Sequence, residues 1–135
     1  MAACGGWHTK RLQEIPGVVE LAGVYDIKPE RNKAAEENGI HAYSSFEELL
    51  ADKTVDVVTV AIPNDQHKKV CIQVMEAGKV AISEKPVTLC TADLEEMIAA
   101  SKRTGSVFTV HQNRRWDVDF LAMKQLYQSG EIGEV

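Results

Sequence analysis

The segment that most constrains the fold of this chain is residues 55–62, with the sequence VDVVTVAI. It is rich in β-branched residues, almost continuously apolar, and followed by Pro63-Asn64, which ends it. A strand with one wet face alternates apolar and polar residues, whereas a strand covered on both faces has no need to. The segment therefore predicts a buried strand near the middle of a parallel sheet.

Strand-like and helix-like segments alternate along the rest of the chain. Further strands are predicted at residues 18–25, 41–43, 80–83 and 107–111. Helices are predicted at residues 7–15, 29–38, 45–52, 65–77, 92–103 and 118–129. Because short connections join these segments, they predict right-handed βαβ units and an α/β fold with a doubly wound parallel sheet. At 135 residues the chain has the size of one domain.

Charge and composition narrow the choice of partners. The net charge is −5, and the sequence contains neither a basic tract nor an apolar run of membrane-spanning length. We therefore expect small-molecule partners, with no nucleic acid and no membrane. Cys4, Cys71 and Cys90 are odd in number and lack the spacing of metal ligands. They predict reduced thiols, a cytoplasmic location and no metal site.

The most informative functional segment is Glu84-Lys85-Pro86, which directly follows the predicted strand 80–83. In an open parallel sheet, ligands bind in the crevice outside the carboxyl ends of the strands. A charged group at that point faces a ligand rather than the core, so Lys85 is the leading candidate for a functional residue. The alternative is a lysine that simply leaves the strand into solvent.

Two further features are typical of a dinucleotide site. Asp26 follows the strand predicted at 18–25, about 20 residues after Gly5, where a carboxylate can bind both ribose hydroxyls and repel a 2′-phosphate. Gly5-Gly6, placed before a helix start, would let the backbone approach a pyrophosphate, which helix N-termini favour. A plain turn explains the two glycines equally well.

Five sequence elements together carry a resemblance to a known family. They are Gly5-Gly6-Trp7-His8, Asp26, Ile62-Pro63-Asn64 with His67, Glu84-Lys85-Pro86, and Asn113-Arg114-Arg115-Trp116-Asp117. In order and spacing the chain resembles the nucleotide-binding half of the Gfo/Idh/MocA oxidoreductases. The resemblance covers essentially the whole chain, and its most specific part is the EKP element followed by an arginine pair. It implies a Rossmann-like domain that binds NAD. NADP is also possible, because Lys28 and Arg31 follow Asp26.

The resemblance also implies an activity, namely hydride transfer between nicotinamide and the hydroxyl-bearing carbon of a sugar or polyol. Lys85 is then the catalytic residue, touching the reacting hydroxyl, where an ammonium stabilises developing negative charge. The implied coenzyme-binding residues are Gly5, Gly6, Trp7, His8, Asp26, Pro63, Asn64, His67, Glu84, Lys85, Arg114 and Arg115. Within this set Asp26 holds the adenosine ribose, and Glu84 lies beside the nicotinamide with Lys85.

Some of these assignments have open alternatives. Arg114 and Arg115 either border the entrance to the nicotinamide and substrate or form a solvated basic corner. His8 and His67 sit at predicted helix starts, where proximity to the coenzyme and simple capping are both plausible. His41 and His111 are predicted to be structural, and no histidine is promoted to the role of catalytic base.

The chain departs from the family pattern at both ends. Family members begin with a strand that leads into a G-x-G-x-x-G loop, whereas only the last part of that loop is recognisable before Trp7. We therefore expect the first, central strand to be missing. Residues 131–135 resemble the entry to a second domain, which in the family supplies most substrate contacts and the acid/base histidine. Residues 1–135 are thus predicted to be a partial NAD(P)-binding domain, with the C-terminal substrate domain absent.

A second class of function stays open on the sequence alone. The chain could be a non-catalytic nucleotide-binding or structural subunit. A missing central strand would expose backbone groups and apolar surface, so a homo-oligomer is expected.

Overall fold

The computed structural model describes the backbone of residues 3–134 and the side chains of residues 5–134. Met1, Ala2, Val135 and the side chains of Ala3 and Cys4 lie outside this part. The elements in chain order are α1 (Ala3–Gln13), α2 (Pro29–Glu37), α3 (Phe46–Ala51), β1 (Val57–Val60), η1 (Asn64–Gln66), α4 (His67–Glu76), β2 (Val80–Ser83), α5 (Thr91–Thr104), β3 (Phe108–Val110), η2 (Asn113–Trp116) and α6 (Val118–Ser129). The predicted α/β class is confirmed, and η1 and η2 are short 3-10 helices.

The sheet has three parallel strands in the order β1-β2-β3. Val57 pairs with Val80, and Ser83 pairs with Val110. The strands predicted from residue patterns at 55–62, 80–83 and 107–111 are therefore present, each shortened or equal in length. The prediction that 55–62 lies in the middle was wrong, since β1 forms an edge of the sheet and β2 the centre. Val57 is accordingly 48% exposed.

Residues 18–25 do not form the predicted strand. They contribute only an isolated parallel bridge between Val24 and Ala42. The amide of Val24 donates to the carbonyl of His41 at 2.9 Å, and the amide of Tyr43 donates to the carbonyl of Val24 at 2.9 Å. This pair of segments does not hydrogen-bond to β1, and Val18 is 78% exposed. Residues 3–13 are helical, so no strand precedes α1 in the described chain. Without a strand between these segments and β1, the β-forming residues of 18–23 have no ladder to join.

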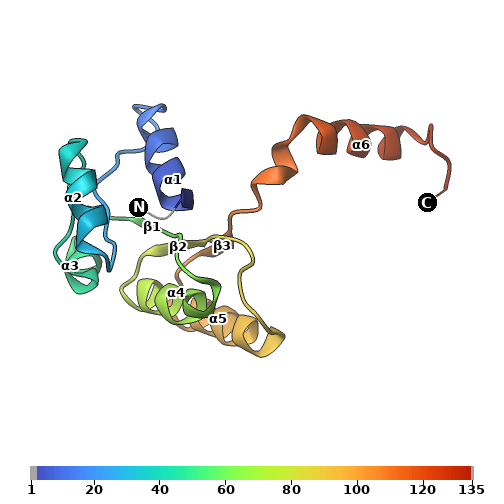
Figure 1. Cartoon of the computed structure of the whole chain (residues 1–135). Coiled ribbons are helices and arrows are strands. Elements are labelled where there is room, and N and C mark those ends of the chain that lie inside the picture. Colours follow the sequence, from blue (N-terminus) through green and yellow to red (C-terminus); the bar gives the residue numbers. More distant parts are fainter. Residues whose placement is uncertain (1–2, 135) are drawn as a thin grey trace.

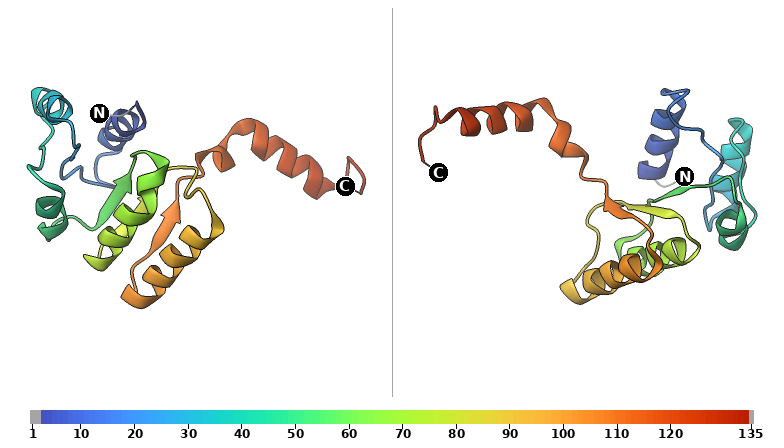
Figure 2. Two further views of the ribbon diagram at one scale, coloured as in Figure 1. Left: turned by 60° about the horizontal axis from the view of Figure 1, so that its bottom comes forward. Right: turned by 180° about the vertical axis from the view of Figure 1, so that it is seen from behind.

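The core lies on one face of the sheet, under α4 and α5 (Figure 1). Its buried members are Val60, Cys71, Val74, Met75, Ala81, Met97 and Ala100. The helices α4 and α5 run side by side across this face in both orientations of Figure 2. Helix α1 lies on the opposite side of the sheet. The two faces are thus covered unequally, and α1 is the element that stands over the carboxyl end of β2.

The last helix extends away from the sheet (Figures 1 and 2). α6 begins at Val118 and ends before Gly130, whose φ of +76° is the left-handed conformation that favours glycine. Its apolar side chains are largely exposed, with Val118 at 84% and Met123 at 62%. No helix within residues 3–134 is long and apolar enough to cross a membrane.

Candidate functional site

The site is organised by the carboxyl ends of β2 and β3. The amide of Glu84 donates to the carbonyl of Val60 at 3.0 Å, and the amide of His111 donates to the carbonyl of Ser83 at 2.8 Å. These bonds continue the sheet ladder one residue past the strand ends. They hold Glu84 and His111 side by side at the edge where ligands bind in open parallel sheets.

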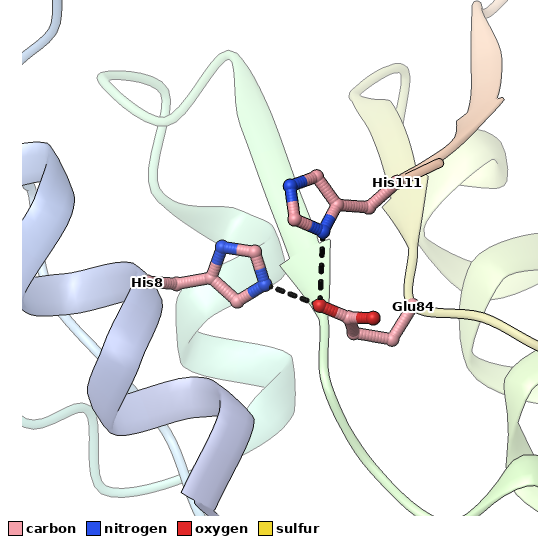
Figure 3. Close-up of side chains that lie close together, drawn as sticks. All are labelled: His8, Glu84 and His111. Atoms are coloured by element: carbon pink, nitrogen blue, oxygen red, sulfur yellow. Dashed lines mark hydrogen bonds and ion pairs between the residues drawn. The ribbon is translucent and has the colours of Figure 1, made fainter. Parts of the chain in front are cut away.

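Glu84 is the centre of a cluster with two histidines (Figure 3). Its Oε1 lies 2.6 Å from Nε2 of His8 and 3.1 Å from Nδ1 of His111. The three side chains are 12%, 13% and 27% exposed for Glu84, His8 and His111 respectively. His8 comes from α1, so this cluster joins α1 to the sheet. A carboxylate only accepts hydrogen bonds, so both imidazoles donate to the same oxygen.

The cluster is flanked by the indole of Trp7. The ring centroids of Trp7 lie 5.2 Å from His8 and 5.9 Å from His111, and the two imidazoles are 4.7 Å apart in an edge-on arrangement. The guanidinium of Arg11 sits 5.7 Å from the Trp7 ring. Trp7 is 45% exposed. The Glu84 carboxylate therefore lies beside a wall of three rings, one of which faces solvent.

Glu84 is held in its charged form. Partial burial acts to raise its pKa, but hydrogen bonds from His8, from the Lys85 amide and from His111 outweigh that effect, so the pKa lies below its ordinary value. At neutral pH the side chain is a carboxylate. It can accept hydrogen bonds or hold a cation, and it is not a proton donor.

Lys85 follows Glu84 and is exposed. Its amide donates to Oε2 of Glu84 at 3.1 Å, and the Lys85-Pro86 peptide bond is cis. Among the described residues its ammonium has no hydrogen-bond or ion-pair partner. The charge is therefore available to a ligand at the same edge of the sheet.

His67 lies at the first position of α4 and is completely buried. Its Nε2 is 3.0 Å from the carbonyl oxygen of Ile62, and its Nδ1 is 3.0 Å from that of Pro86 and 3.3 Å from that of Val87. The ring thus ties the segment after β1 to the segment after β2. The sequence left both proximity to the coenzyme and simple capping open for His67. In the structure the enclosed ring supports the loops that form the site, and its proximity to a coenzyme stays a prediction.

Pro63 and Asn64 lie at the carboxyl end of β1. Pro63 precedes η1, Asn64 begins it, and both are exposed. Because β1 and β2 are parallel neighbours, these two residues share an edge of the sheet with Glu84 and Lys85. The structure therefore brings them to the predicted edge.

Asp26 lies on the segment that leads into α2. Its Oδ1 accepts from the amide of Lys28 at 3.0 Å, and its Oδ2 accepts from Nη1 of Arg31 at 3.0 Å. The Asn32 side chain bonds both the amide and the carbonyl of Asp26 at 2.8 Å, which fixes the backbone. Burial acts to raise the Asp26 pKa, but the Lys28 amide and Arg31 prevail and lower it. The carboxylate is ionised, positioned, and 18% exposed.

Gly5 and Gly6 do not precede the first helix as predicted. They lie inside α1, which begins at Ala3. They are still in its first turn, where helix amides lack acceptors within the helix. Their carbonyls accept from the Thr9 hydroxyl at 3.2 and 3.0 Å.

Arg114 and Arg115 lie in η2 and are exposed. Arg114 pairs with Asp117 at 2.9 Å, and its side chain is 83% exposed. Among the described residues no hydrogen bond or ion pair joins either arginine to the Glu84 cluster. The structure therefore does not bring this pair into the cluster, and its role at the entrance stays a prediction.

The sequence interpretation missed His111, which it treated as structural. A signal was available, because His111 follows its strand as directly as Glu84 follows β2. A hollow elsewhere on the described surface contains none of the predicted residues. It lies at the amino ends of β1 and β2 and is lined by Leu50, Ala51, Lys53, Val55, Asp56, Ala77, Gly78, Lys79 and Val80.

Comparisons with known proteins agree with this architecture. Residues 2–112 match the model of an oxidoreductase family with an NAD-binding Rossmann fold, named Gfo/Idh/MocA. The chain is 32% identical over 134 residues to inositol 2-dehydrogenase of Salmonella typhimurium. It is 33% identical over 132 residues to the scyllo-inositol 2-dehydrogenase (NADP(+)) IolU of Bacillus subtilis. These alignments cover 96% and 93% of this chain.

Comparison with solved structures also finds proteins of the same fold. An NAD-binding protein from Listeria innocua superposes with a TM-score of 0.92 at 42% identity, over 98% of this chain and 39% of that one. A myo-inositol 2-dehydrogenase from Lactobacillus plantarum superposes with a TM-score of 0.89 over 99% of this chain and 40% of that one, at 23% identity, and shows the shared fold. The chain spans 40% of the length of the two curated dehydrogenases.

Proposed function

Because the chain belongs to the Gfo/Idh/MocA family of oxidoreductases, with their NAD-binding Rossmann fold, we propose that it is the coenzyme-binding part of a hydride-transferring enzyme. The nicotinamide coenzyme would bind across the carboxyl ends of β1, β2 and β3. The observation that carries the proposal is the pair Glu84-Lys85 at the end of the central strand, with an ammonium that has no protein partner within the described residues.

The residues present fit an adenosine ribose at Asp26. Each carboxylate oxygen of Asp26 accepts one hydrogen bond from the protein, from Lys28 or from Arg31. A carboxylate oxygen has two lone pairs, so each retains one acceptor position for a ribose hydroxyl. The two hydrogen bonds between the Asn32 side chain and the backbone of Asp26 hold that backbone in place. Asp26 would thus select the ribose end of the coenzyme.

The first turn of α1 fits a pyrophosphate. The amides of that turn and the positive end of the helix dipole attract anions, and Gly5 and Gly6 present no side chain there. Among the described residues, a Cβ added at Gly5 would meet no atom within 4 Å apart from its chain neighbours and the backbone of α1. Gly5 and Gly6 would therefore act by allowing close backbone approach.

Lys85 would act at the reacting oxygen of the substrate. A bound nicotinamide supplies or accepts the hydride. An ammonium beside an alcohol oxygen stabilises the negative charge that develops there, and Glu84 keeps its own charge at neutral pH. The Glu84 carboxylate, positioned by His8 and His111, would accept hydrogen bonds from the carboxamide of the nicotinamide and so orient its ring.

The substrate class proposed is a sugar or polyol with a secondary hydroxyl. The support is that two relatives bear names of inositol dehydrogenases. Since this chain spans 40% of their length, the contacts that choose among polyols would come from the part of such an enzyme that these residues do not span.

We propose NAD as the coenzyme, with NADP as the alternative. The ionised Asp26 would repel a 2′-phosphate. Arg31, which pairs with Asp26, offsets part of that repulsion, and the relative IolU is named for NADP(+).

A specific observation also favours a second candidate, a non-catalytic subunit that associates through its exposed surfaces. The outer edge of β1 has no strand partner within the described chain, and the apolar side chains of α6 are exposed. Unpaired strand edges and apolar patches promote association. We therefore propose a homo-oligomer. The free thiols Cys71 and Cys90 fit a reducing, cytoplasmic location.

Calorimetric titration with NAD⁺, NADH and NADP⁺ tests the proposal. Saturable binding that weakens in Asp26→Ala and persists in the control Asp119→Ala, an exposed aspartate on α6, supports coenzyme binding. Absence of saturable heat with all three dinucleotides would contradict it. Sedimentation analysis over a concentration series separates a monomer from an oligomer.

A further inference from the structure

The side chains of His8, Glu84 and His111 carry atoms that can bind a ligand other than a coenzyme. One nitrogen of each histidine and one oxygen of Glu84 all lie within 4.8 Å of one another. The three groups converge from α1 and from the ends of two neighbouring strands (Figure 3). The structure therefore gathers three potential metal ligands at one point, although they are far apart in the sequence.

We infer that these three side chains form a binding site for a divalent transition metal ion, Zn²⁺ in the first place. Imidazole nitrogens and a carboxylate oxygen are the ligand set of zinc sites that keep an open position. The same set in a facial arrangement suits Fe²⁺ and Co²⁺. A hard cation such as Mg²⁺ prefers oxygen ligands and would not select this cluster.

The geometry is close to what the metal needs. Two ligands at ordinary zinc distances in a tetrahedral site are about 3.3 Å apart. His111 Nδ1 and Glu84 Oε1 are 3.1 Å apart, whereas His8 Nε2 and Glu84 Oε1, at 2.6 Å, must separate. Glu84 can make this adjustment because, among the described residues, the only hydrogen bond to its other oxygen comes from the adjacent amide of Lys85. A small rotation of one carboxylate therefore opens the site.

The positions of the protons also allow a metal ion to replace the two hydrogen bonds between the histidines and Glu84. In the metal-free cluster the nitrogens that face Glu84 carry the hydrogens, since the carboxylate can only accept. A neutral imidazole moves its hydrogen to the other ring nitrogen when the first binds a metal. The ion thus replaces two shared hydrogen bonds without removing a net proton from any neutral ring.

The surroundings predict a reversible site rather than a permanent structural one. Three protein ligands leave at least one coordination position for water, as in open zinc sites. Metal-bound histidines usually donate their second N–H to a protein acceptor. Within the described residues neither His8 Nδ1 nor His111 Nε2 has such a partner. The expected affinity is therefore moderate, and the ion would exchange with solvent through the exposed side of Trp7.

This inference does not rest on the proposed function, but it has a consequence for it. Glu84 belongs to both sites, so Zn²⁺ and a nicotinamide coenzyme would compete. Binding of Zn²⁺ without binding of any dinucleotide would support the metal site and contradict the proposed function. Binding of NADH without binding of Zn²⁺ would support the proposed function and contradict the metal site.

The test is calorimetric titration of Zn²⁺ into a tag-free Cys4→Ser/Cys90→Ser chain, so that neither of these two thiols can bind the ion. The third thiol, Cys71, is buried. We expect one Zn²⁺ per chain, with affinity reduced at least about tenfold in His8→Gln, Glu84→Gln and His111→Gln. His41→Gln, which removes an exposed histidine outside the cluster, should bind like the parent. Equal affinity in all four variants, or no saturable binding, would overturn the inference.

A measurement on the unsubstituted cluster covers the case in which a variant fails to fold. In nuclear magnetic resonance spectra of the same chain, Zn²⁺ should shift the ring signals of His8 and His111 and leave those of His41 in place. Co²⁺ should give visible absorption bands of a low-symmetry site that Zn²⁺ then removes. Zinc-induced shifts at other histidines only would assign the ion elsewhere and contradict this site.

Discussion

The imidazole of His111 donates to the Glu84 carboxylate at 3.1 Å, and these two residues occupy equivalent positions just beyond two neighbouring parallel strands. Their proximity follows from register, because the preceding residues Ser83 and Val110 are paired. The same edge carries Lys85 and lies below α1, which adds His8. The sheet thus sets the positions of the groups to which we assign coenzyme binding and catalysis.

Lys85→Ala should slow hydride transfer by an enzyme that contains this domain, while leaving the fold intact. The side chain is exposed and makes no ion pair within the described residues, so its loss costs little stability. If the ammonium acts at the reacting oxygen, the rate should fall by at least about 100-fold. The measurement is NADH absorbance with a panel of polyols, and Lys69→Ala on α4 is the matched exposed control. Equal, measurable rates in Lys85→Ala and in the parent enzyme would remove Lys85 from the mechanism.

Arg31→Ala should increase the preference for NAD over NADP. It removes the cation that pairs with Asp26 at 3.0 Å, which leaves the carboxylate to repel a 2′-phosphate fully. Loss of one charge-assisted contact to phosphate corresponds to about 1.5–3 kcal/mol, so NADP⁺ binding should weaken by at least about tenfold. Calorimetry with NAD⁺ and NADP⁺ checks this, with the exposed Arg103→Ala as control. An unchanged ratio of the two affinities would show that Arg31 does not face the 2′ position.

His67→Ala should destabilise the chain strongly. The buried ring links the carbonyls of Ile62 and Pro86, and its removal leaves a cavity and unpaired acceptors. A loss of about 2–4 kcal/mol in the free energy of unfolding is expected. Urea unfolding followed by circular dichroism measures it. The exposed neighbour Gln66→Ala should change stability by less than about 0.5 kcal/mol. Similar stability of both variants would mean that the ring does not brace the loops.

Asp52 should stabilise the chain at neutral pH, and this stabilisation should be lost in acid. Its carboxylate accepts from Tyr43 at 2.7 Å and from Thr54, and these bonds lower its pKa from 3.8 to about 2. The stabilisation is complete above the unfolded pKa of 3.8 and is lost as the pH falls through the folded value of about 2. Tyr43→Phe should therefore lower the melting temperature more at neutral pH than near pH 2. A difference that is independent of pH would contradict this coupling.

Local patterns were sufficient for most of the elements. Pro29 and Gly39 bracketed α2, residues 118–129 matched α6, and the apolar runs located β1 and β2. These signals are local because a helix satisfies its own backbone and an apolar run marks burial wherever it occurs. The family resemblance, by contrast, rested on short motifs at fixed spacing, and the match over residues 2–112 confirmed it.

The incorrect predictions concerned the pairing of segments that are far apart in the sequence. Residues 18–25 have strand composition but form one bridge, and β1 has central-strand composition but lies at an edge. In both cases the residue pattern indicates the surroundings that a segment favours. It does not determine whether a partner strand is present. The sharing of Glu84 by His8 and His111 depends on strand register and on the placement of α1. Neither is visible in residue spacing.

The most direct test of the account is to map the contacts of NADH on the isotope-labelled chain by nuclear magnetic resonance. We predict saturable shifts of two groups of amide signals at one common dissociation constant, those of Asp26 and Lys28 and those of Glu84 and Lys85. That result would place one coenzyme along the carboxyl ends of the strands. Shifts confined to the hollow around Leu50 and Lys79, or no saturable shifts, would contradict the assignment of this chain as a coenzyme-binding domain.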